Sequence, residues 1–463
     1  MKNILNCWAI SLILLLAACA NNPLGSYTSN MSPSLLALSN GNSTQAENKI
    51  SGKNDLLYYL EHGTVLRLSD KYTQSNSDFS FAQQYIDQWA ASFHNGNLGL
   101  AADTLEASLV NDKVIDYAAK DYEKVMLPTY KALNYMALGD IDSARIEITR
   151  MYNIEDIIHD YREAVYAKTQ SDVENSNPKK NTSFATFEQV ESINKGEYDF
   201  EALNSPQVLA LKNSYQNSFS HYLAGFIFEA LQEPSLARPG YVKALELNPG
   251  NKLIKQSIDN VDKASAANNN NMTDLLIIEE VGHAPQLKSV SFSVPFFTTS
   301  GQNKCSKLIT ISFPQLVFDA QNHSAADIGV DGQSLQPMLF TNFDLMASRY
   351  LHDNLPNIYL RNTLRAAKDL ALQQSVCSEG GGIASLITTI GTKFLGTADE
   401  RTWVTLPRQI YVTRIKMTRG KHNISVNVGG AFKQIRVNLT KSYAVLSLRI
   451  IGNSVYFSPE QNK

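Results

Sequence analysis

The residue most clearly placed for chemistry is Cys19, which ends the apolar run Leu16-Ala17-Ala18-Cys19. This tetrapeptide has the form of a lipobox, where a signal peptidase cuts before the cysteine and the thiol then carries a diacylglycerol. Lys2 supplies a positive charge, and Trp8 to Leu16 is an apolar stretch of the length that signal peptides have. A bilayer span needs about 20 apolar residues, which this run lacks. We therefore expect residues 1–18 to be a lipoprotein signal peptide and Cys19 to be lipidated.

The residues after the cysteine bear on location. Ala20 and Asn21 lack the Asp that commonly retains enterobacterial lipoproteins at the inner membrane. Acyl chains contribute about 0.8 kcal/mol per buried methylene, so two on the thiol and one on the new amine anchor a chain firmly in a bilayer. We expect a bacterial cell-envelope protein, anchored through lipid in the outer membrane and facing the periplasm.

Two further cysteines could pair. Cys7 leaves with the signal peptide, so Cys305 and Cys377 are the thiols that remain. An oxidising compartment favours a disulfide between them, which would close a loop of about 70 residues and stabilise the fold by roughly 4 kcal/mol. Two separately buried free thiols fit the spacing equally well, so both interpretations stay open.

Other catalytic or metal-binding patterns are weak. No nucleophile elbow, phosphate loop or His-Glu-x-x-His sequence occurs, and no Cys/His spacing indicates a metal site. Ser192 and Lys195 have the spacing of penicillin-binding enzymes but lack the partner motifs. Glu279-Glu280 with His283 suggests a metal site less than it suggests surface carboxylates where a strand turns. The sequence predicts a protein that is not an enzyme and has no cofactor and no metal.

Composition sets the broad class. The chain has 463 residues, 43% of them hydrophobic and 18% charged, which suits two or three globular domains. Its formal net charge of −3 becomes −4 when Lys2 leaves with the signal peptide. A near-neutral chain without a basic run argues against nucleic acid as a partner.

Hydrophobic periodicity predicts a helical first half. Residues 19–53 are rich in Ser, Asn and Gly, which suggests a flexible tether. Residues 54–263 carry apolar positions at helical spacing, with a break at 73–78 that suggests a turn between helices. Tyr122 to Met151, around Gly139-Asp140, and Tyr215 to Pro249 have the helix–turn–helix pattern of a tetratricopeptide (TPR) repeat. A generic helical bundle is the alternative. Between these units, 169–186 are polar, and we expect a mobile loop there.

The period changes from 3.6 to 2 in the second half. Residues 264–273, with four successive Asn, suggest a linker to a β-rich domain at 274–458. Helical sequence interrupts this domain at about 341–376. Overall we expect an α+β multidomain fold: an N-terminal all-α TPR-like helical repeat domain, then an antiparallel β-sandwich-like domain with a helical insertion. Strands are expected at 275–280, 287–294, 308–313, 402–406, 409–417, 422–428, 435–439 and 443–450.

Several short motifs carry a resemblance to a known family. They are Leu133-Asn134-Tyr135, residues 138–140, 144–147, 279–285, 360–368 and 398–407. With them, the chain from about Leu56 onward resembles a little-characterised family of TPR-containing bacterial outer-membrane lipoproteins. Family members typically have Glu-Glu-Gly-x-Ala-Pro, so Val281 is an insertion here, and Asp-Thr-Arg-Ser-Trp stands where this chain has 399–403. Relatives are often found with small lipoproteins that regulate cell-wall synthesis or envelope secretion, so the resemblance implies an envelope role.

The predicted function is a scaffold or adaptor that binds envelope proteins through a groove of the TPR-like helices. The candidate groove residues are polar or amphipathic positions on those helices, namely Tyr130, Asn134, Arg145, Asn217 and His221. Two other classes remain as alternatives. One is a structural subunit of an oligomeric outer-membrane ring, in which the β half self-associates, and the other is a cell-wall-active enzyme.

The segment Asp399-Glu400-Arg401-Thr402-Trp403 allows two interpretations. In the first it is an exposed recognition loop, with Trp403 as an anchor and Arg401 as a bidentate donor to a partner. In the second, Trp403 belongs to the core of a strand and Arg401 pairs with Asp399.

Overall fold

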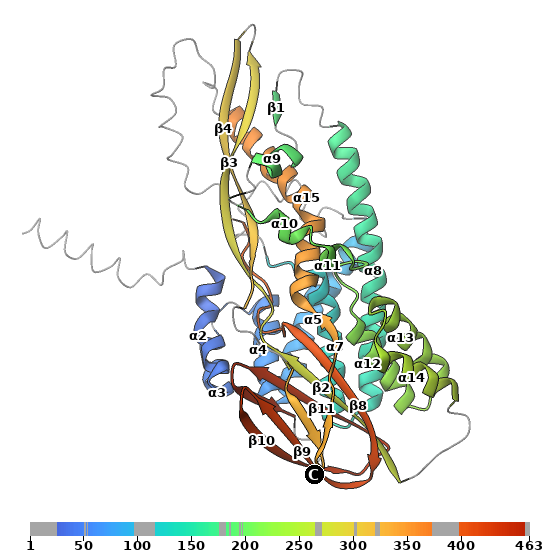
Figure 1. Cartoon of the computed structure of the whole chain (residues 1–463). Coiled ribbons are helices and arrows are strands. Elements are labelled where there is room, and N and C mark those ends of the chain that lie inside the picture. The colour runs from blue at the N-terminus through green and yellow to red at the C-terminus, as the bar shows by residue number, and fades with distance from the viewer. Residues whose placement is uncertain are drawn as a thin grey trace, which may run out of the picture.

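The computed structural model describes most of the chain beyond the predicted signal peptide. The described residues are 26–50, 52, 54–96, 116–175, 182–184, 187–193, 196, 198–263, 271–300, 303–319, 325–372 and 398–458. In Figure 1 two sheets lie at the lower end of the molecule, helices lie above them from left to right, and a long hairpin extends to the top. Within the described part, no helix is both long and apolar enough to cross a membrane.

Three antiparallel helix pairs form the helical half. Their bounds are α4 (Leu56–Leu68) with α5 (Tyr72–His94), α7 (Asp121–Ala137) with α8 (Ile141–Asn175), and α12 (Ser218–Ala230) with α13 (Pro234–Leu247). The helix α14 (Lys252–Lys263) packs on α13 and follows the last pair. In the first and third pairs a glycine of the first helix lies against an aromatic ring 16 positions later: Gly63 against Phe79, and Gly225 against Tyr241. In the second pair Ala132 and Ile148 have the same spacing and belong to the same hydrophobic core.

The glycines permit the close approach. A Cβ built on Gly63 would lie 2.6 Å from the Phe79 ring, and one on Gly225 would lie 2.6 Å from Tyr241. Each pair also turns through one residue with positive φ, seven positions after the small residue: Asp70 (58°), Gly139 (77°) and Gln232 (62°). A residue in this conformation ends a helix, because the amide of the residue after it can then donate to a carbonyl of the last helical turn. This common spacing makes the helical half TPR-like.

Two sheets form the β half. The first has the order β12-β11-β2-β8-β7, and the second has the order β10-β9-β5-β6. The pairing of β11 with β2 is parallel, so the prediction of a purely antiparallel sandwich is wrong for this sheet. The strand bounds are β2 Met272–Val281, β5 Asp327–Val330, β6 Gln333–Leu335, β7 Met338–Asn342, β8 Gln409–Thr418, β9 Gly420–Val428, β10 Ala431–Leu439, β11 Tyr443–Ile451 and β12 Ser454–Phe457.

The five-stranded sheet is a middle layer. Successive side chains of a strand point to opposite faces, and β2 buries both. Leu275 and Ile277 pack with the four-stranded sheet, whereas Leu276 and Ile278 pack with the helices. Because both faces are covered, the centre of β2 is a run of four apolar residues, Leu275 to Ile278. The helical and β halves therefore share one hydrophobic core.

A long hairpin extends from this body (Figure 1). Its strands β3 (Gln286–Ser300) and β4 (Asn303–Val317) pair along their whole length, and β1 (Thr182–Phe184) adds to β3. Phe292 and Phe313 of the hairpin pack with Leu351 and Leu355 of α15 (Phe343–Leu372), the predicted helical insertion. Three short helices accompany it: α9 (Phe187–Ile193), α10 (Phe200–Leu203) and α11 (Pro206–Leu209).

Much of the predicted tether is folded. Residues 26–50 include α2 (Tyr27–Ser39) and α3 (Ser43–Lys49), whose Leu38 and Ala46 pack against Ile451. Ser39 and Leu38 also accept hydrogen bonds from Ser454 (2.9 Å) and Tyr456 (2.6 Å) of β12. A Ser- and Asn-rich composition concealed this amphipathic helix, so the tether prediction is wrong for the part after Gly25.

Three other expectations need correction. Residues 73–78 are not a turn, because α5 starts at Tyr72. Residues 402–406 are not a strand but an irregular segment that is nonetheless buried. The expected loop at 169–186 begins later, since α8 continues to Asn175. The predicted linker, 264–273, overlaps the start of β2 at Met272 and Thr273, and its residues 264–270 lie outside the described part.

Candidate functional site

Helices α4 and α7 bind a segment from the second half of the same chain, residues 398–408. Trp403 is its centre, with 0% of its surface exposed. The indole ring meets Phe79 and Tyr130 edge-on, at centroid distances of 5.9 and 5.7 Å. Its Nε1 donates to Thr64 Oγ1 at 2.9 Å. The exposed recognition loop is therefore wrong, and Trp403 is buried as the second interpretation has it, but in an irregular segment and not in a strand.

Glu61 of α4 binds the backbone of this segment. Its carboxylate accepts the amides of Val404 (2.8 Å) and Thr405 (3.1 Å), and the hydroxyls of Thr405 and Tyr27. Burial raises the pKa of Glu61 to about 7, and the hydrogen bonds from Thr405, Tyr27 and Val404 act in the opposite direction. Such donors stabilise a carboxylate that has no cation beside it.

Glu123 of α7 binds the same segment one step earlier. One carboxylate oxygen accepts the amide of Trp403 (2.8 Å) and the hydroxyl of Thr402 (2.9 Å). The other accepts the amide of Lys120 (2.7 Å) and the hydroxyl of Tyr117. Glu123 thus caps its own helix and holds the segment at once. Next to it, Arg401 donates to Asp399 at 2.8 Å, the pairing expected in the buried interpretation.

These contacts amount to recognition of an irregular peptide segment by a helical surface, made within one chain. Four consecutive residues, 402–405, donate to two carboxylates, mostly through backbone groups. Backbone recognition is largely independent of side-chain identity, so Trp403 supplies the specificity. We call Glu61, Glu123 and residues 398–408 the internal clamp.

A charged layer lies beside the clamp. Arg67 donates to Asn134 (3.0 Å) and to Glu280 (3.4 Å), while Asn134 donates to Ser75 and Asn76 (both 2.9 Å). Asn134 and Tyr130, at 0% and 1% exposure, were expected to face an open groove. That expectation is wrong, because the C-terminal half covers the surface that a peptide would otherwise reach.

Arg449 of β11 completes this layer from the other side. Its Nη2 donates to the carbonyls of Gly282 (2.7 Å), Thr405 (2.9 Å) and Leu406 (3.2 Å). Burial lowers the pKa of Arg449 from its ordinary value, because water no longer solvates the charge. The guanidinium therefore ties β11 to the end of the clamped segment.

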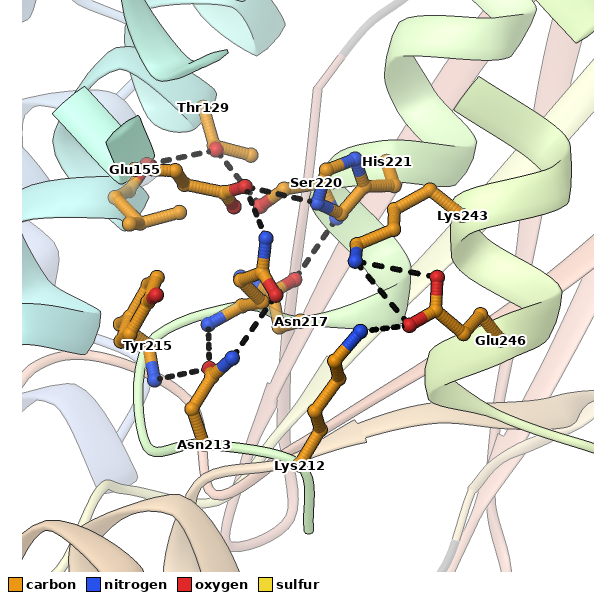
Figure 2. A network of polar contacts seen from close by, with 12 residues as sticks. Thr129, Glu155, Lys212, Asn213, Tyr215, Asn217, Ser220, His221, Lys243 and Glu246 are labelled. Atoms are coloured by element: carbon orange, nitrogen blue, oxygen red, sulfur yellow. Dashed lines mark hydrogen bonds and ion pairs between the residues drawn. The ribbon is translucent and has the colours of Figure 1, made fainter. Parts of the chain in front are cut away.

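Figure 2 shows where the later candidate residues lie. Asn217 is the N-cap of α12: its side-chain oxygen accepts the Ser220 amide at 2.8 Å. His221 Nε2 lies 3.1 Å from Glu155 of α8. Asn217 and His221 are 3% and 2% exposed, so they join helix pairs to each other and do not face a groove.

Arg145 is the candidate that keeps access to solvent. Its side chain is 43% exposed and pairs with Glu233 at 3.1 Å, across the second and third helix pairs. The guanidinium also lies 6.0 Å from the centre of the Phe228 ring. An exposed pair of this kind contributes little to stability.

Glu279 and Glu280 are not surface carboxylates. Both lie in β2, 0% and 1% exposed. Glu279 accepts the Ala326 amide at 2.8 Å, and burial raises its pKa to about 8. No group of three metal-binding side chains occurs among the residues that the structure describes.

The covalent predictions fall largely outside the described residues. Cys19 and Cys377 lie outside them, and of Cys305 only the backbone, in β4, is described. Lipidation of Cys19 and the Cys305–Cys377 disulfide remain predictions.

An open cavity of about 330 Å³ lies between α2 and the base of the β3–β4 hairpin. Leu36, Val317 and Phe318 line it and are 63%, 38% and 40% exposed. Volumes of a few hundred Å³ with apolar walls are typical of sites that accept a small apolar group.

Comparison with known proteins adds little to this picture. No family model matches the chain, and no curated protein matches it. Three solved structures have low scores. A tetratricopeptide repeat protein from Parabacteroides merdae has 12% identity over 51% of this chain and 98% of its own, with a TM-score of 0.13. The APC/C Cut9–Hcn1 hetero-tetramer has 11% identity over 54% of this chain and 45% of its own, with a TM-score of 0.14. The P58(IPK) TPR domain has 13% identity over 57% of this chain and 95% of its own, with a TM-score of 0.12. Such scores carry no argument, so the TPR-like assignment depends on the geometry of the helix pairs.

Sequence reasoning missed the two carboxylates that matter most. Glu61 lies within an apolar helix, Leu56–Leu68, where a charge needs a partner or a donor. Glu123 is the third residue after Lys120, the N-cap of α7. A glutamate at this position can form a capping box. Both signals are local, but their partner segment lies about 280 or more residues away.

Proposed function

We propose that this protein is a non-enzymatic scaffold of the bacterial envelope, anchored in the outer membrane through lipid on Cys19 and facing the periplasm. In this proposal its TPR-like helices build one rigid body with the β half, and that body presents outer surfaces to envelope proteins. A role beside cell-wall synthesis or envelope secretion follows from the family resemblance. The observation that carries the proposal is the internal clamp, because it shows what the helical surface is used for.

The clamp changes how the scaffold would bind. TPR-like helices commonly offer a groove to a partner, but here residues 398–408 fill that position. Trp403 belongs to the same hydrophobic core as α4, α7 and α12, so its release would open the core. A partner therefore binds elsewhere, and we propose the cavity beside α2 as its site. Its apolar rim suits an apolar side chain of a partner protein.

The test is in-cell crosslinking from a photoreactive residue at Leu36, on the rim of the cavity. Ile146 is a matched control, because it is similarly exposed (63% and 59%) but lies on α8. We expect a discrete protein adduct from Leu36 and not from Ile146. Absence of an adduct from Leu36, at normal expression, would contradict the proposed binding site.

Lipid attachment is tested separately. Metabolic labelling with an alkyne fatty acid should mark the wild-type protein, and Cys19→Ser should remove the label and release the protein from the outer-membrane fraction. A label that persists in Cys19→Ser would contradict the anchor.

One observation favours the second candidate, a subunit of a homo-oligomeric ring. Among the described strands β10 pairs with β9 alone, and Phe432 on it is 68% exposed. An unpaired strand edge can add a strand from another copy. Light scattering of the detergent-solubilised protein distinguishes a ring from a monomeric adaptor.

A further inference from the structure

Charge is strongly segregated along this chain. Of its 41 Lys and Arg residues 11 lie after Glu400, but only one of its 44 Asp and Glu residues does. Residues 401–463 therefore carry a net charge of +10 and residues 1–400 carry −13. Between Arg401 and Ser458 there is no carboxylate at all. The near-neutral total conceals this separation.

Some of these cations bind carboxylates or carbonyls of the rest of the chain. Arg408 pairs with Asp344 (2.5 Å), and Arg414 pairs with both Asp274 (2.6 Å) and Glu229 (2.8 Å). Arg401 and Arg449 are held as described above. Among these, Arg414 joins the β half to the helical half through Glu229 of α12, whereas the other partners lie in the second half of the chain.

Four other cations gather at one end of the β half, and we call them the basic tip: Lys416, Arg419, Lys421 and Lys441. The backbone places them together. The Arg419 amide donates to Asn271 at 3.0 Å, and Thr273 Oγ1 donates to the carbonyl of Lys441 at 2.6 Å. Lys416 lies opposite Asp274, and Lys421 lies opposite Asn438.

The basic tip has no neutralising partner within the described part of the chain. Lys416, Arg419 and Lys421 are exposed, and Lys441 is half-buried. Asp274 is the carboxylate nearest in register, but both of its oxygens bind Arg414. Asp331, near Lys421, is bonded to His422 and Asn423.

We propose that the basic tip docks on a bilayer surface that carries anionic phospholipid headgroups. Charge complementarity favours such a surface, because each Lys or Arg near an anionic leaflet strengthens binding about five-fold. The described residues of the tip include no exposed large aromatic side chain, which single-stranded nucleic acid binders use for stacking. The proposal rests on the proposed function in one respect: the lipid anchor at Cys19 would hold the protein next to a bilayer.

The test measures vesicle binding of the mature chain, residues 19–463, with Cys19→Ser so that acyl groups do not contribute. All described residues lie within it. Vesicles of phosphatidylcholine with one quarter phosphatidylglycerol are compared with vesicles of phosphatidylcholine alone. We expect binding to the anionic vesicles alone, and steep weakening as salt is raised.

A triple variant locates the binding. Arg419→Ala with Lys421→Ala and Lys441→Ala should weaken binding on the order of 100-fold. The matched control replaces three exposed lysines of α14, Lys252, Lys255 and Lys263, with Ala, and it should bind as the wild type does. Circular dichroism confirms that both variants are folded.

Three results would overturn the proposal. They are equal binding to both kinds of vesicle, equal weakening in both triple variants, and tighter binding to double-stranded DNA than to anionic vesicles at the same salt. A failure here leaves the Cys19 label and the Leu36 adduct unchanged, so it is distinguishable from failure of the proposed function.

Discussion

Arg414 and Lys416 stand two residues apart on the same strand and have opposite uses. Arg414 is 7% exposed at its side chain and binds Asp274 and Glu229, which come from β2 and α12. Lys416 is exposed and has no ion-pair partner among the described residues. The register alone does not explain this difference, because Asp274 lies opposite Lys416 in the pairing of β2 with β8 but both of its oxygens bind Arg414. Carboxylates of the acidic first 400 residues meet one cation and not the other.

The same contrast holds across the C-terminal segment. Where helices cover it, its charges and backbone donors are paired: Arg408 with Asp344 of α15, Arg414 with Glu229 of α12, and the internal clamp with α4 and α7. Where nothing covers it, at the basic tip, the charges stay in solvent. Buried charges must be paired, whereas exposed charges are free for an external partner. Each prediction below tests one side of this division.

Arg414→Met should have the largest effect. Removing one partner leaves Asp274 and Glu229 without their cation in a partly buried place, which costs about 3–5 kcal/mol in comparable cases. Lys416→Met on the same strand should change the free energy of unfolding by less than about 0.5 kcal/mol. Urea denaturation followed by circular dichroism measures both. Similar losses in the two variants would break the comparison.

Glu61→Ala should cause the next largest loss of stability. The Val404 and Thr405 amides and the Tyr27 hydroxyl would lose their acceptor inside the core. A buried donor left without a partner costs about 1–3 kcal/mol of stability. For the whole substitution we expect the free energy of unfolding to fall by about 3 kcal/mol. Glu246→Ala is the exposed counterpart, since its pairing with Lys212 lies in solvent, and it should be nearly neutral. A Glu61→Ala loss below about 1 kcal/mol would mean that the clamp does not hold the segment.

Glu279 should produce a smaller, pH-dependent effect. Its folded pKa of about 8 lies above the ordinary value of 4.5, so the folded state binds the proton more tightly. The stability that this gives is complete below about pH 4.5 and is lost as pH rises through 8. Glu279→Gln removes the titration and should be more stable than the wild type at pH 9 by roughly 2 kcal/mol. Parallel pH profiles for the two proteins would contradict a raised pKa.

Local patterns predicted the regular elements well. Periodicity located α7, α15, β2, β8, β9 and β11 to within a few residues, because each has a continuous apolar face or alternation. The TPR-like units were also accessible, since Gly63 and Gly225 each stand 16 residues before an aromatic ring. The folded helices α2 and α3 were missed because their composition is polar and only a few positions, such as Leu38, are buried.

The site was predicted less well for a different reason. Asn134 and Asn217 are polar residues on amphipathic helices, and in an isolated TPR-like array such residues face solvent. Here Asn134 is bonded to Arg67, Ser75 and Asn76 of the neighbouring helix pair, whereas Asn217 bonds to Thr341 of the β half. The identity of the covering segment depends on how two halves dock, which no local pattern contains.

The most direct test of the central claim is hydrogen exchange of the peptide that contains residues 398–408, measured by mass spectrometry in the wild type and in Glu61→Gln with Glu123→Gln. The account predicts that the Trp403, Val404 and Thr405 amides, bonded to these carboxylates, exchange as slowly as the core strand β2 in the wild type. They should exchange markedly faster in the double variant, while α14 is unchanged. Fast exchange of these amides in the wild type would contradict the clamp and return the helical surface to the role of an open groove.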